Sequence, residues 1–432
     1  GDKLITNNQN VIDILSKDTV DYDKQELRLL SNQIILPMKN IKMTTEGSIY
    51  ASNAVMLEIE LRGNHLDLEK EKITFERFLR SVDVDNNNIQ TIDYGTFVIL
   101  TTEYDEGSDI TNVLAYDLMV QTQREYNKED VTVNFPNTAR NVLKSIVEAC
   151  DLELDTAPFT NEDYIVQMDY WNNASYTYRD ALDQFCQLSA STMKIKNGKV
   201  FVFKEQDTGI KLDTKFASLK FGEKYGKTNI LNISQEPQHD NFFSPENAMN
   251  TIPAADRKEL VFSNNPMLYQ DPQNWANKLL PLVKDLEYRT ADFTIYHGGI
   301  FEVGDVIEIK NGDIYEKVLV TQQIYENSNV QVQLNSSKPY SFKSEYVVET
   351  DQRREGQTVY FIVDKQNGII EGLVSKVDEN SENLASLTIT VDGIEQKVNS
   401  LNVGDNVIPN LAGTFDNYQY WDFEDTPQIE VN

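Results

Sequence analysis

Apolar and polar residues alternate along much of the first 120 positions, as in strands with one buried face. The clearest runs are Val55–Leu61, Tyr94–Leu100 and Asn112–Asp117, and polar turns separate them. Several short strands at this spacing are typical of a β-sandwich or a β-barrel. A second region of alternating residues, from about 206 to 340, predicts that strands return after an interruption.

The interruption has the helical period of 3.6 residues. A first helix is predicted after Thr138, a suitable N-cap, and a second after Thr177, where Asp180 three residues on completes a variant of the capping box. The apolar faces of the two helices consist of Val142, Leu143, Ile146, Val147 and Cys150, and of Leu182, Phe185, Cys186 and Ser189. Together with the hairpin that follows, they predict a small α/β unit.

Two Asn-Gly pairs predict hairpins with tight turns. Asn197-Gly198 and Asn311-Gly312 each lie between apolar runs, and both central residues of a type I′ turn need positive φ. One more amphipathic helix is predicted in the later strand region, with Trp275, Leu279, Leu280, Val283 and Leu286 on its apolar face. The predicted order is therefore strands, a small α/β unit, strands with one helix, and a C-terminal segment.

Apolar residues in the C-terminal segment recur at spacings that alternate between three and four. This heptad-like pattern follows the strand-like run Val359–Asp364 and predicts a coiled-coil stalk over 369–402, through which chains would self-associate. Leu387, Ile389 and Val391 also alternate at period two, so a strand ribbon remains the alternative for the second half. The candidate oligomerisation residues are Ile370, Leu373, Val377, Leu384, Leu387, Val391, Ile394, Val398 and Leu401.

The residues beyond the predicted stalk have the character of an opening strand. Asn406–Leu411 and the aromatic stretch Phe415–Phe423 lead to Asn432, and we expect an appended β domain to begin there. The sequence starts at Gly1 and stops within an element, so we expect it to be a portion of something longer.

The length of the chain indicates its number of domains, and its charge disfavours one class of ligand. A chain of 432 residues is expected to form two to four domains. Its 39 basic and 69 acidic residues give a net charge of -30, which disfavours nucleic acid as a bound ligand because phosphate binding needs clustered Lys and Arg. The sequence contains no run of 18 apolar residues, so no insertion into a bilayer is predicted.

Motifs that resemble catalytic or ligand sites are incomplete. Gly222 and Gly226, before Lys227 and Thr228, are separated by three residues, whereas a phosphate-binding loop needs four and a following helix. The run that begins at Asp83 has Asn88 where a calcium loop needs Gly, and Tyr94 where it needs Glu, although weak calcium binding stays open.

The histidines and cysteines also lack the neighbours that chemistry needs. His65, His239 and His297 have no second His or Cys at metal-ligand spacing, and no serine in a nucleophile-elbow pattern accompanies them. Cys150 and Cys186 fall on apolar helix faces, which predicts two buried thiols in preference to a disulfide. We therefore predict no catalytic residues, no cofactor and no metal site.

Several blocks of sequence follow one another in a fixed order over nearly the whole chain. They are Tyr94–Leu100, Val113–Asp117, Thr177–Leu182, Lys196–Val200, Asn265–Leu268, Glu302–Ile307, Asp364–Ile370 and Asn406–Asn410. In this order the blocks resemble the tail-tip or baseplate hub proteins of long-tailed bacteriophages. These are minor structural proteins, some of which are tail endopeptidase-like or the N-terminal part of tail-associated lysins.

The resemblance implies a multi-domain, mainly β fold with an α+β insert. Two tube-like β-barrels in tandem, the insert, and the coiled-coil stalk would follow one another, and three chains would form a ring with pseudo-sixfold symmetry. The implied ranges are 1–129 for the first barrel, 130–205 for the small α/β insert, 206–345 for the second barrel, 346–368 for a linker, 369–402 for the stalk and 403–432 for the start of the appended domain.

The resemblance further implies a structural role in the virion tail tip, after assembly in the cytoplasm of a bacterial host. A homotrimeric hub would close the tail tube and open for DNA ejection. Its partners would be the distal tail protein, the tape-measure protein and receptor-binding or tail-fibre proteins, with transient contact to the host cell wall, no specific nucleic-acid binding and no membrane insertion.

Two other functions are compatible with the sequence. The chain is an adaptor portion of a tail-associated peptidoglycan hydrolase if a catalytic domain follows residue 432. Alternatively, it is a cell-surface saccharide-binding tail module, since Tyr418, Tyr420, Trp421 and Phe423 are residues that stack on sugar rings.

Overall fold

The computed structural model describes residues 9–15, 20–83, 88–172, 176–212, 216–235, 240–263, 265–329 and 331–336, together with the backbone of five strands between 347 and 398. The chain divides into an N-terminal unit, residues 1–122 with 126–342, and a C-terminal unit, residues 123–125 with 343–432. Within the described part of the chain, no helix is long and apolar enough to cross a membrane.

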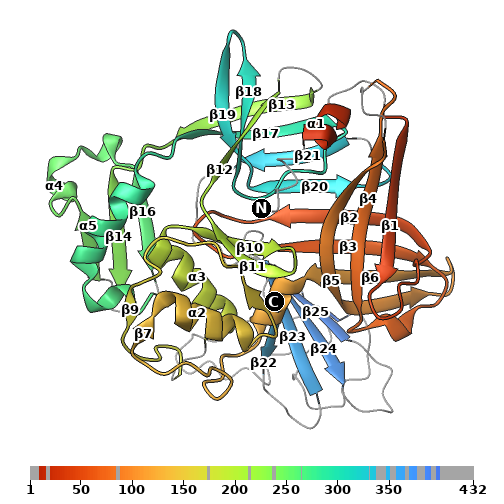
Figure 1. Ribbon diagram of the computed structural model, residues 1–432, viewed down its shortest axis with the longest axis horizontal. Helices are drawn as coiled ribbons and strands as arrows, with labels where there is room; N and C mark the ends of the chain where they lie inside the picture. Colours follow the sequence, from red (N-terminus) through yellow and green to blue (C-terminus); the bar gives the residue numbers. More distant parts are fainter. Residues whose placement is uncertain are drawn as a thin grey trace, which may run out of the picture. The chain divides into compact units, whose positions relative to one another are not determined.

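A ten-stranded antiparallel sheet forms the N-terminal unit's main layer, and it curls so that β1 and β4 run across the direction of β2 and β20 (Figure 1). The strand candidates expected near 55–61, 94–100 and 112–117 are confirmed within it. In spatial order the strands are β1 (Tyr22–Leu29), β4 (Lys72–Arg80), β5 (Gln90–Asp105), β6 (Ile110–Asp117), β3 (Ala54–Arg62), β2 (Met38–Glu46), β20 (Gln322–Glu326), β21 (Gln331–Ser336), β17 (Tyr288–Tyr296) and β13 (Phe216–Tyr225).

Strands from both expected barrels meet in this one sheet. β2 pairs with β20 from Lys42 opposite Glu326 to Glu46 opposite Gln322, so six strands of the first half continue into four strands of the second half. The mainly β fold is confirmed, but among the described residues no pairing closes either half into a separate barrel. Because backbone hydrogen bonds continue across β2 and β20, the two halves share one sheet and one hydrophobic core cluster.

A small sheet of β12 (Gln206–Leu212), β18 (Asp305–Asn311) and β19 (Ile314–Leu319) accompanies the second half. The expected hairpin between β18 and β19 is confirmed, but its turn is displaced by one residue. Asn311 pairs with Ile314, so the two-residue loop is Gly312-Asp313, with φ +63° at Gly312. The turn therefore has glycine at its first central position, as in type II′.

Both helices of the predicted α/β unit form, and each begins after its predicted N-cap residue. α2 (Ala139–Glu148) begins after Thr138, whose side chain accepts a hydrogen bond from the Asn141 amide. α3 (Tyr178–Ser189) begins with a complete capping box between Thr177 and Asp180. The strands that accompany the helices are β7 (Asn137–Thr138), β8 (Glu153–Leu154), β9 (Ile165–Val166), β10 (Thr192–Lys196) and β11 (Lys199–Phe203).

The β10–β11 hairpin confirms the first predicted turn. Lys196 pairs with Lys199, and Asn197 and Gly198 have φ of +50° and +73°, as a type I′ turn requires.

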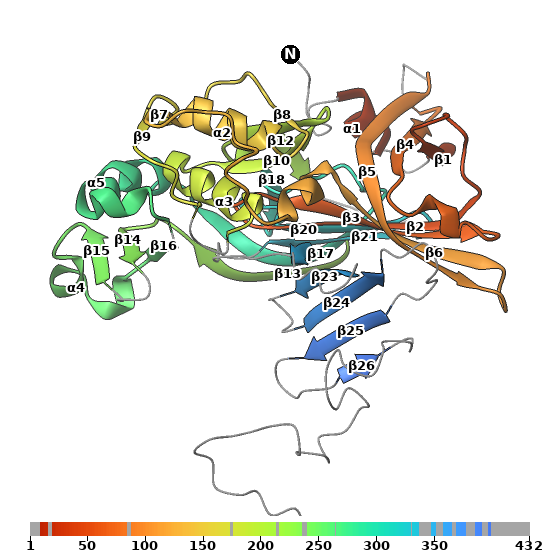
Figure 2. The same ribbon diagram turned by 90° about the horizontal axis from the view of Figure 1, so that it is seen from below.

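A second small layer packs against these helices (Figure 2). Its sheet consists of β15 (Asp240–Ser244), β14 (Ile230–Gln235) and β16 (Glu259–Ser263), and α5 (Pro272–Val283) is the predicted amphipathic helix. Trp275, Leu279 and Val283 of α5 share one hydrophobic cluster with α2 and α3, so these strands contribute to a core separate from that of the ten-stranded sheet. The remaining short elements are α1 (Gln9–Leu15), α4 (Ala248–Thr251) and the 3-10 turns Leu66–Leu68, Leu118–Gln123, Ala254–Asp256 and Leu268–Gln270.

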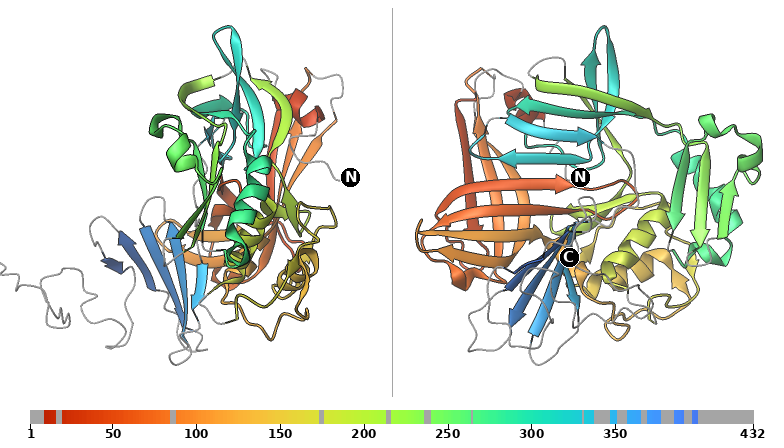
Figure 3. Two further views of the ribbon diagram at one scale, coloured as in Figure 1. Left: turned by 90° about the vertical axis from the view of Figure 1, so that its left-hand side faces the viewer. Right: turned by 180° about the vertical axis from the view of Figure 1, so that it is seen from behind.

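The C-terminal unit contains an antiparallel five-stranded sheet instead of the predicted coiled coil. Its strands are β22 (Val347–Thr350), β23 (Gln357–Asp364), β24 (Ile369–Lys376), β25 (Ala385–Thr390) and β26 (Gln396–Val398), which lie side by side in blue in Figure 3. The segment expected as a linker, 346–368, holds β22 and β23, and 403–432 lies outside the described residues.

The physical reason for this correction lies in residue type and local pairing. The segment is rich in β-branched residues, which favour strands, and its alternation at period two competes with the three-four spacing. Strand pairing joins neighbouring segments in register, with Asp364 opposite Ile369 and Ile370 opposite Ile389. A heptad seam needs a partner helix, whereas this meander satisfies its backbone within one chain.

Candidate functional site

The junction between the two halves of the large sheet contains a buried arginine. Arg77 lies on β4 and is only 2% exposed. Its Nε and Nη2 donate to the two carboxylate oxygens of Asp23 on β1, at 2.8 and 2.6 Å, and its Nη1 donates to the Gly298 carbonyl at 2.7 Å. One guanidinium therefore links two strands of the first half to the loop that follows β17 in the second half.

Aromatic rings complete this junction. The guanidinium lies 4.7 Å from the centre of the Tyr325 ring on β20. The Tyr94 hydroxyl on β5 donates to the Gly299 carbonyl at 2.8 Å, and burial raises the pKa of that hydroxyl, so it stays a donor. Asp23, Arg77, Tyr94, Gly298, Gly299 and Tyr325 are called the Arg77 clamp below.

Gly299 is the position in the clamp where only glycine fits. Its φ is +91°, and a Cβ there would lie 2.8 Å from both Arg77 Nη1 and the Tyr325 ring. A side chain would push the loop away from the guanidinium, so the close approach of the two halves depends on this glycine.

The large sheet ends in two edges that are long enough to pair with another chain. Among the described residues, β13 pairs with β17 alone, and β1 pairs with β4 and, at its C-terminal end only, with a single bridge from Arg28 to Ile35. The turn after β1 also exposes three apolar side chains, Leu30, Ile34 and Ile35, by 40, 56 and 51%. An exposed edge strand presents free backbone donors and acceptors, which makes both edges candidate assembly surfaces.

A second polar cluster fastens α3 to the turn before β3. Arg179 Nη2 donates to the Ser52 carbonyl at 2.6 Å, and Asp183 Oδ1 accepts from the Ser52 amide at 2.8 Å and from the Ser52 hydroxyl. Nearby, Asp117 accepts from the amides of Val55 and Met119, both at 3.0 Å. The cluster holds the small α/β unit and the large sheet together.

Burial controls ionisation in this cluster. It raises the pKa of Asp117 to about 7 and that of Asp183 to about 6, and in each case the charge of Arg179 opposes the rise. Because the folded-state pKa exceeds the unfolded one, the native state binds more protons between about pH 4 and the raised pKa. The stabilising contribution of each protonated carboxyl is thus present at low pH and is lost as the pH rises through this window.

Replacing Asp183 with asparagine tests this effect. The amide oxygen keeps both hydrogen bonds from Ser52 while the titrating charge is removed. Relative to wild type, we expect Asp183→Asn to gain stability from pH 4 to pH 7, by up to about 3 kcal/mol for a shift of two pKa units. Thermal unfolding across this pH range measures the gain, and a constant difference between the two proteins would contradict the assignment.

The structure separates the residues that the sequence proposed for oligomerisation. Ile370 and Leu373 lie in β24, Leu387 in β25 and Val398 in β26, so these four do not form a helical seam. Val377, Leu384, Val391, Ile394 and Leu401 lie outside the described residues, as do the aromatic residues from 418 to 423.

The motifs considered for chemistry occupy structural positions. Cys150 and Cys186 are free and buried, as predicted, and burial raises the pKa of the Cys186 thiol. His65 Nε2 lies 2.9 Å from the Arg62 carbonyl, while His239 lies outside the described residues. Strand β13 ends at Tyr225 and β14 begins at Ile230, so no helix follows the glycine-rich segment. No group of three or more potential metal ligands occurs among the residues with described positions.

Sequence reasoning missed the Arg77 clamp, although the signal was present. Within β4, residues 73, 75, 77 and 79 are the buried positions, and three of them are Ile73, Phe75 and Leu79. Arg77 stands in phase with these apolar residues, and a charged residue on the buried face of a strand needs a partner. The partner loop lies more than 200 residues away, so the sequence alone does not identify it.

Comparison with known proteins gives structural neighbours only. No protein-family model and no curated protein sequence matches the chain. Among solved structures, the 43 kDa tail protein of prophage MuSo2 from Shewanella oneidensis is similar, with a TM-score of 0.47 and 9% identity, over 74% of this chain and 97% of that one. The prophage tail protein gp18 from Listeria monocytogenes has a TM-score of 0.43 and 13% identity, over 73% and 94% of the two chains.

A third similar structure is the E. coli protein c3393, described as a component of the type VI secretion system with structural similarity to the T4 tail proteins gp27 and gp5. Its TM-score is 0.38 at 8% identity, over 82% of this chain and 97% of that one. Two of these three structures are described as prophage tail proteins.

Proposed function

We propose that this chain is a structural hub protein of a long-tailed phage tail tip, which assembles as a homotrimer, closes the tail tube and opens for DNA ejection. The observation that carries the proposal is the ten-stranded sheet, in which a first and a second set of strands follow each other in the chain and join at β2 and β20. Two tandem sets per chain are what a threefold assembly needs to match a sixfold tube.

The sheet edges support a specific route to the trimer. β1 of one chain pairs with β13 of the next in this proposal, a heterologous contact that closes into a ring after three copies. Ring closure would leave neither edge strand exposed, which removes the aggregation hazard of a long unpaired strand. In this proposal Ile370, Leu373, Leu387 and Val398 contribute to self-association from strands β24, β25 and β26 of the C-terminal unit.

The proposed place and partners follow from that role. The protein resides in the virion tail tip after assembly in the bacterial cytoplasm, and it contacts the distal tail protein, the tape-measure protein and receptor-binding or tail-fibre proteins. A net charge of -30 per chain disfavours binding of DNA phosphates. In this proposal, DNA therefore passes through the channel of the trimer during ejection without being held by its wall. The ranges 1–129, 130–205 and 206–345 are proposed as functional divisions of the chain.

The role requires no bond-breaking chemistry, and we expect no enzymatic activity from residues 1–432. The test is a zymogram with purified protein on peptidoglycan, with a muralytic enzyme as the positive control. No clearing is expected, because both cysteines are buried and the sequence has no serine in a nucleophile-elbow pattern. Clearing that persists in independently purified preparations would contradict a purely structural role.

A further inference from the structure

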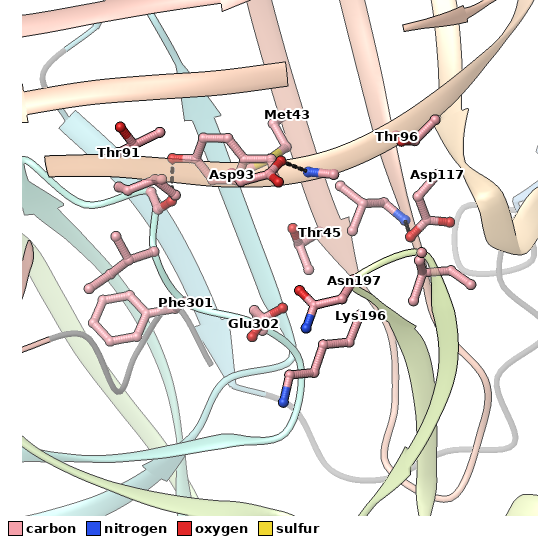
Figure 4. A pocket seen from close by; sticks show the side chains of 18 of the residues that line it. Met43, Thr45, Thr91, Asp93, Thr96, Asp117, Lys196, Asn197, Phe301 and Glu302 are labelled. Carbon is pink, nitrogen blue, oxygen red and sulfur yellow. Dashed lines mark hydrogen bonds between the residues drawn. The ribbon is translucent and has the colours of Figure 1, made fainter. Parts of the chain in front are cut away.

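A cavity of about 380 Å³ lies beside the junction, bounded by β2, β5, the β10–β11 turn and the loop that precedes β18. This volume is within the range of small-molecule sites. Figure 4 shows the side chains of Thr45, Asn197 and Glu302 around the same space, contributed by three different elements.

Thr45 is the most informative residue of this cavity. It stands on β2 in phase with Ile41 and Met43, two core residues, and it is only 6% exposed. Its hydroxyl has no hydrogen-bond partner among the described residues, and the side chain points into the cavity (Figure 4). The hydroxyl is accessible from the cavity, so a bound group can hydrogen-bond to it there.

The charged residues that line the cavity already have partners. Asp93 accepts from the Gly95 amide at 2.8 Å, Glu302 is paired with Lys194 at 2.8 Å, and the Lys196 ammonium lies 4.6 Å from the centre of the Phe201 ring. Lys194 offsets the charge of Glu302, and Asp93 and Lys196 carry opposite charges, so the lining has little net charge and favours a neutral ligand.

The remaining lining matches a polyhydroxylated molecule. Hydroxyl and amide groups of Thr45, Thr91, Thr96 and Asn197 can donate and accept hydrogen bonds, and the carboxylates retain lone pairs for ligand hydroxyls. Met43, Ile300 and Phe301 supply apolar and aromatic surface for the carbon face of such a ligand.

We propose that this cavity binds a neutral polyhydroxylated ligand of monosaccharide size, with Thr45 and Asn197 as specificity-determining residues. This site is distinct from the assembly role above and does not depend on the trimer, because all of its lining residues belong to one chain.

The test measures saturation transfer by NMR from the full chain to D-glucose, D-galactose and N-acetyl-D-glucosamine at millimolar concentration. Wild-type protein is expected to transfer saturation to at least one sugar. Thr45→Val, which removes the hydroxyl at nearly constant volume, is expected to weaken that binding about fivefold, the effect of one lost hydrogen bond. Thr294→Val on β17 is the matched control outside the cavity and is expected to bind as wild type.

A second variant keeps the test decisive if Thr45→Val does not fold. Asn197→Gly removes the amide and retains the positive φ of the turn, so the hairpin is preserved while sugar binding weakens. The proposal is overturned if none of the three sugars receives saturation, or if binding is unchanged in both variants. Binding of putrescine without binding of the sugars would also overturn it, since that result indicates a site for cations.

Discussion

Arg77→Met is expected to lower the free energy of unfolding of the N-terminal unit by about 2 kcal/mol. The substitution retains the apolar stem but removes three hydrogen bonds and the charge opposite Asp23. Asp23, whose side chain is 28% exposed, would keep its contact with water and its hydrogen bond from Gln25, but the buried Gly298 carbonyl would lose its donor. Urea unfolding followed by tryptophan and tyrosine fluorescence measures the loss.

Arg80→Met on the same strand provides the matched control. Arg80 also donates two hydrogen bonds to a carboxylate, that of Asp21, but its side chain is 40% exposed. Because water screens exposed ion pairs, we expect this variant to lose less than about 1 kcal/mol. Equal losses in the two variants would show that burial at the junction does not strengthen the Arg77 clamp.

Ala217→Pro is expected to weaken the proposed trimer at least about tenfold in its dissociation constant. Ala217 lies on the edge strand β13, is exposed, and has no partner residue on β17 because the register shifts between Phe216 and Ser218. Proline removes one backbone donor and obstructs pairing with a further strand, while the existing β13–β17 pairs remain. Sedimentation velocity over a concentration series measures the change.

Ala217→Val is the control for this substitution. Valine keeps the backbone N–H and favours strand conformation, so its association is expected to equal that of wild type. Should the proline variant associate as strongly as the valine variant, the β13 edge would not be part of the interface.

The sequence predicted the elements whose signals are local. Thr138 and Thr177 begin helices because their side chains satisfy amide groups within the next three residues, and Asn197-Gly198 forms its turn because both residues tolerate positive φ. The burial of Cys150 and Cys186 followed from their place on an apolar stripe. Each of these predictions needs only a few neighbouring residues.

Features that depend on distant partners were missed or wrong. Pairing of β2 with β20 joins residues almost 300 positions apart, and no pattern within either strand distinguishes this pairing from closure of two separate barrels. In the sequence, Thr45 has no feature that distinguishes it from other strand residues. Its place in a cavity depends on Asn197 and Glu302, which come from distant parts of the chain. In the C-terminal unit, the three-four spacing and the period-two alternation coexist, and local strand pairing outweighs the helical seam.

The mass of the assembled protein tests the central claim most directly. Size-exclusion chromatography with multi-angle light scattering on residues 1–432 is expected to give three times 49.5 kDa, or about 149 kDa, for wild type and for Ala217→Val. A species of 49.5 kDa that persists up to the highest attainable protein concentration would contradict the trimeric hub.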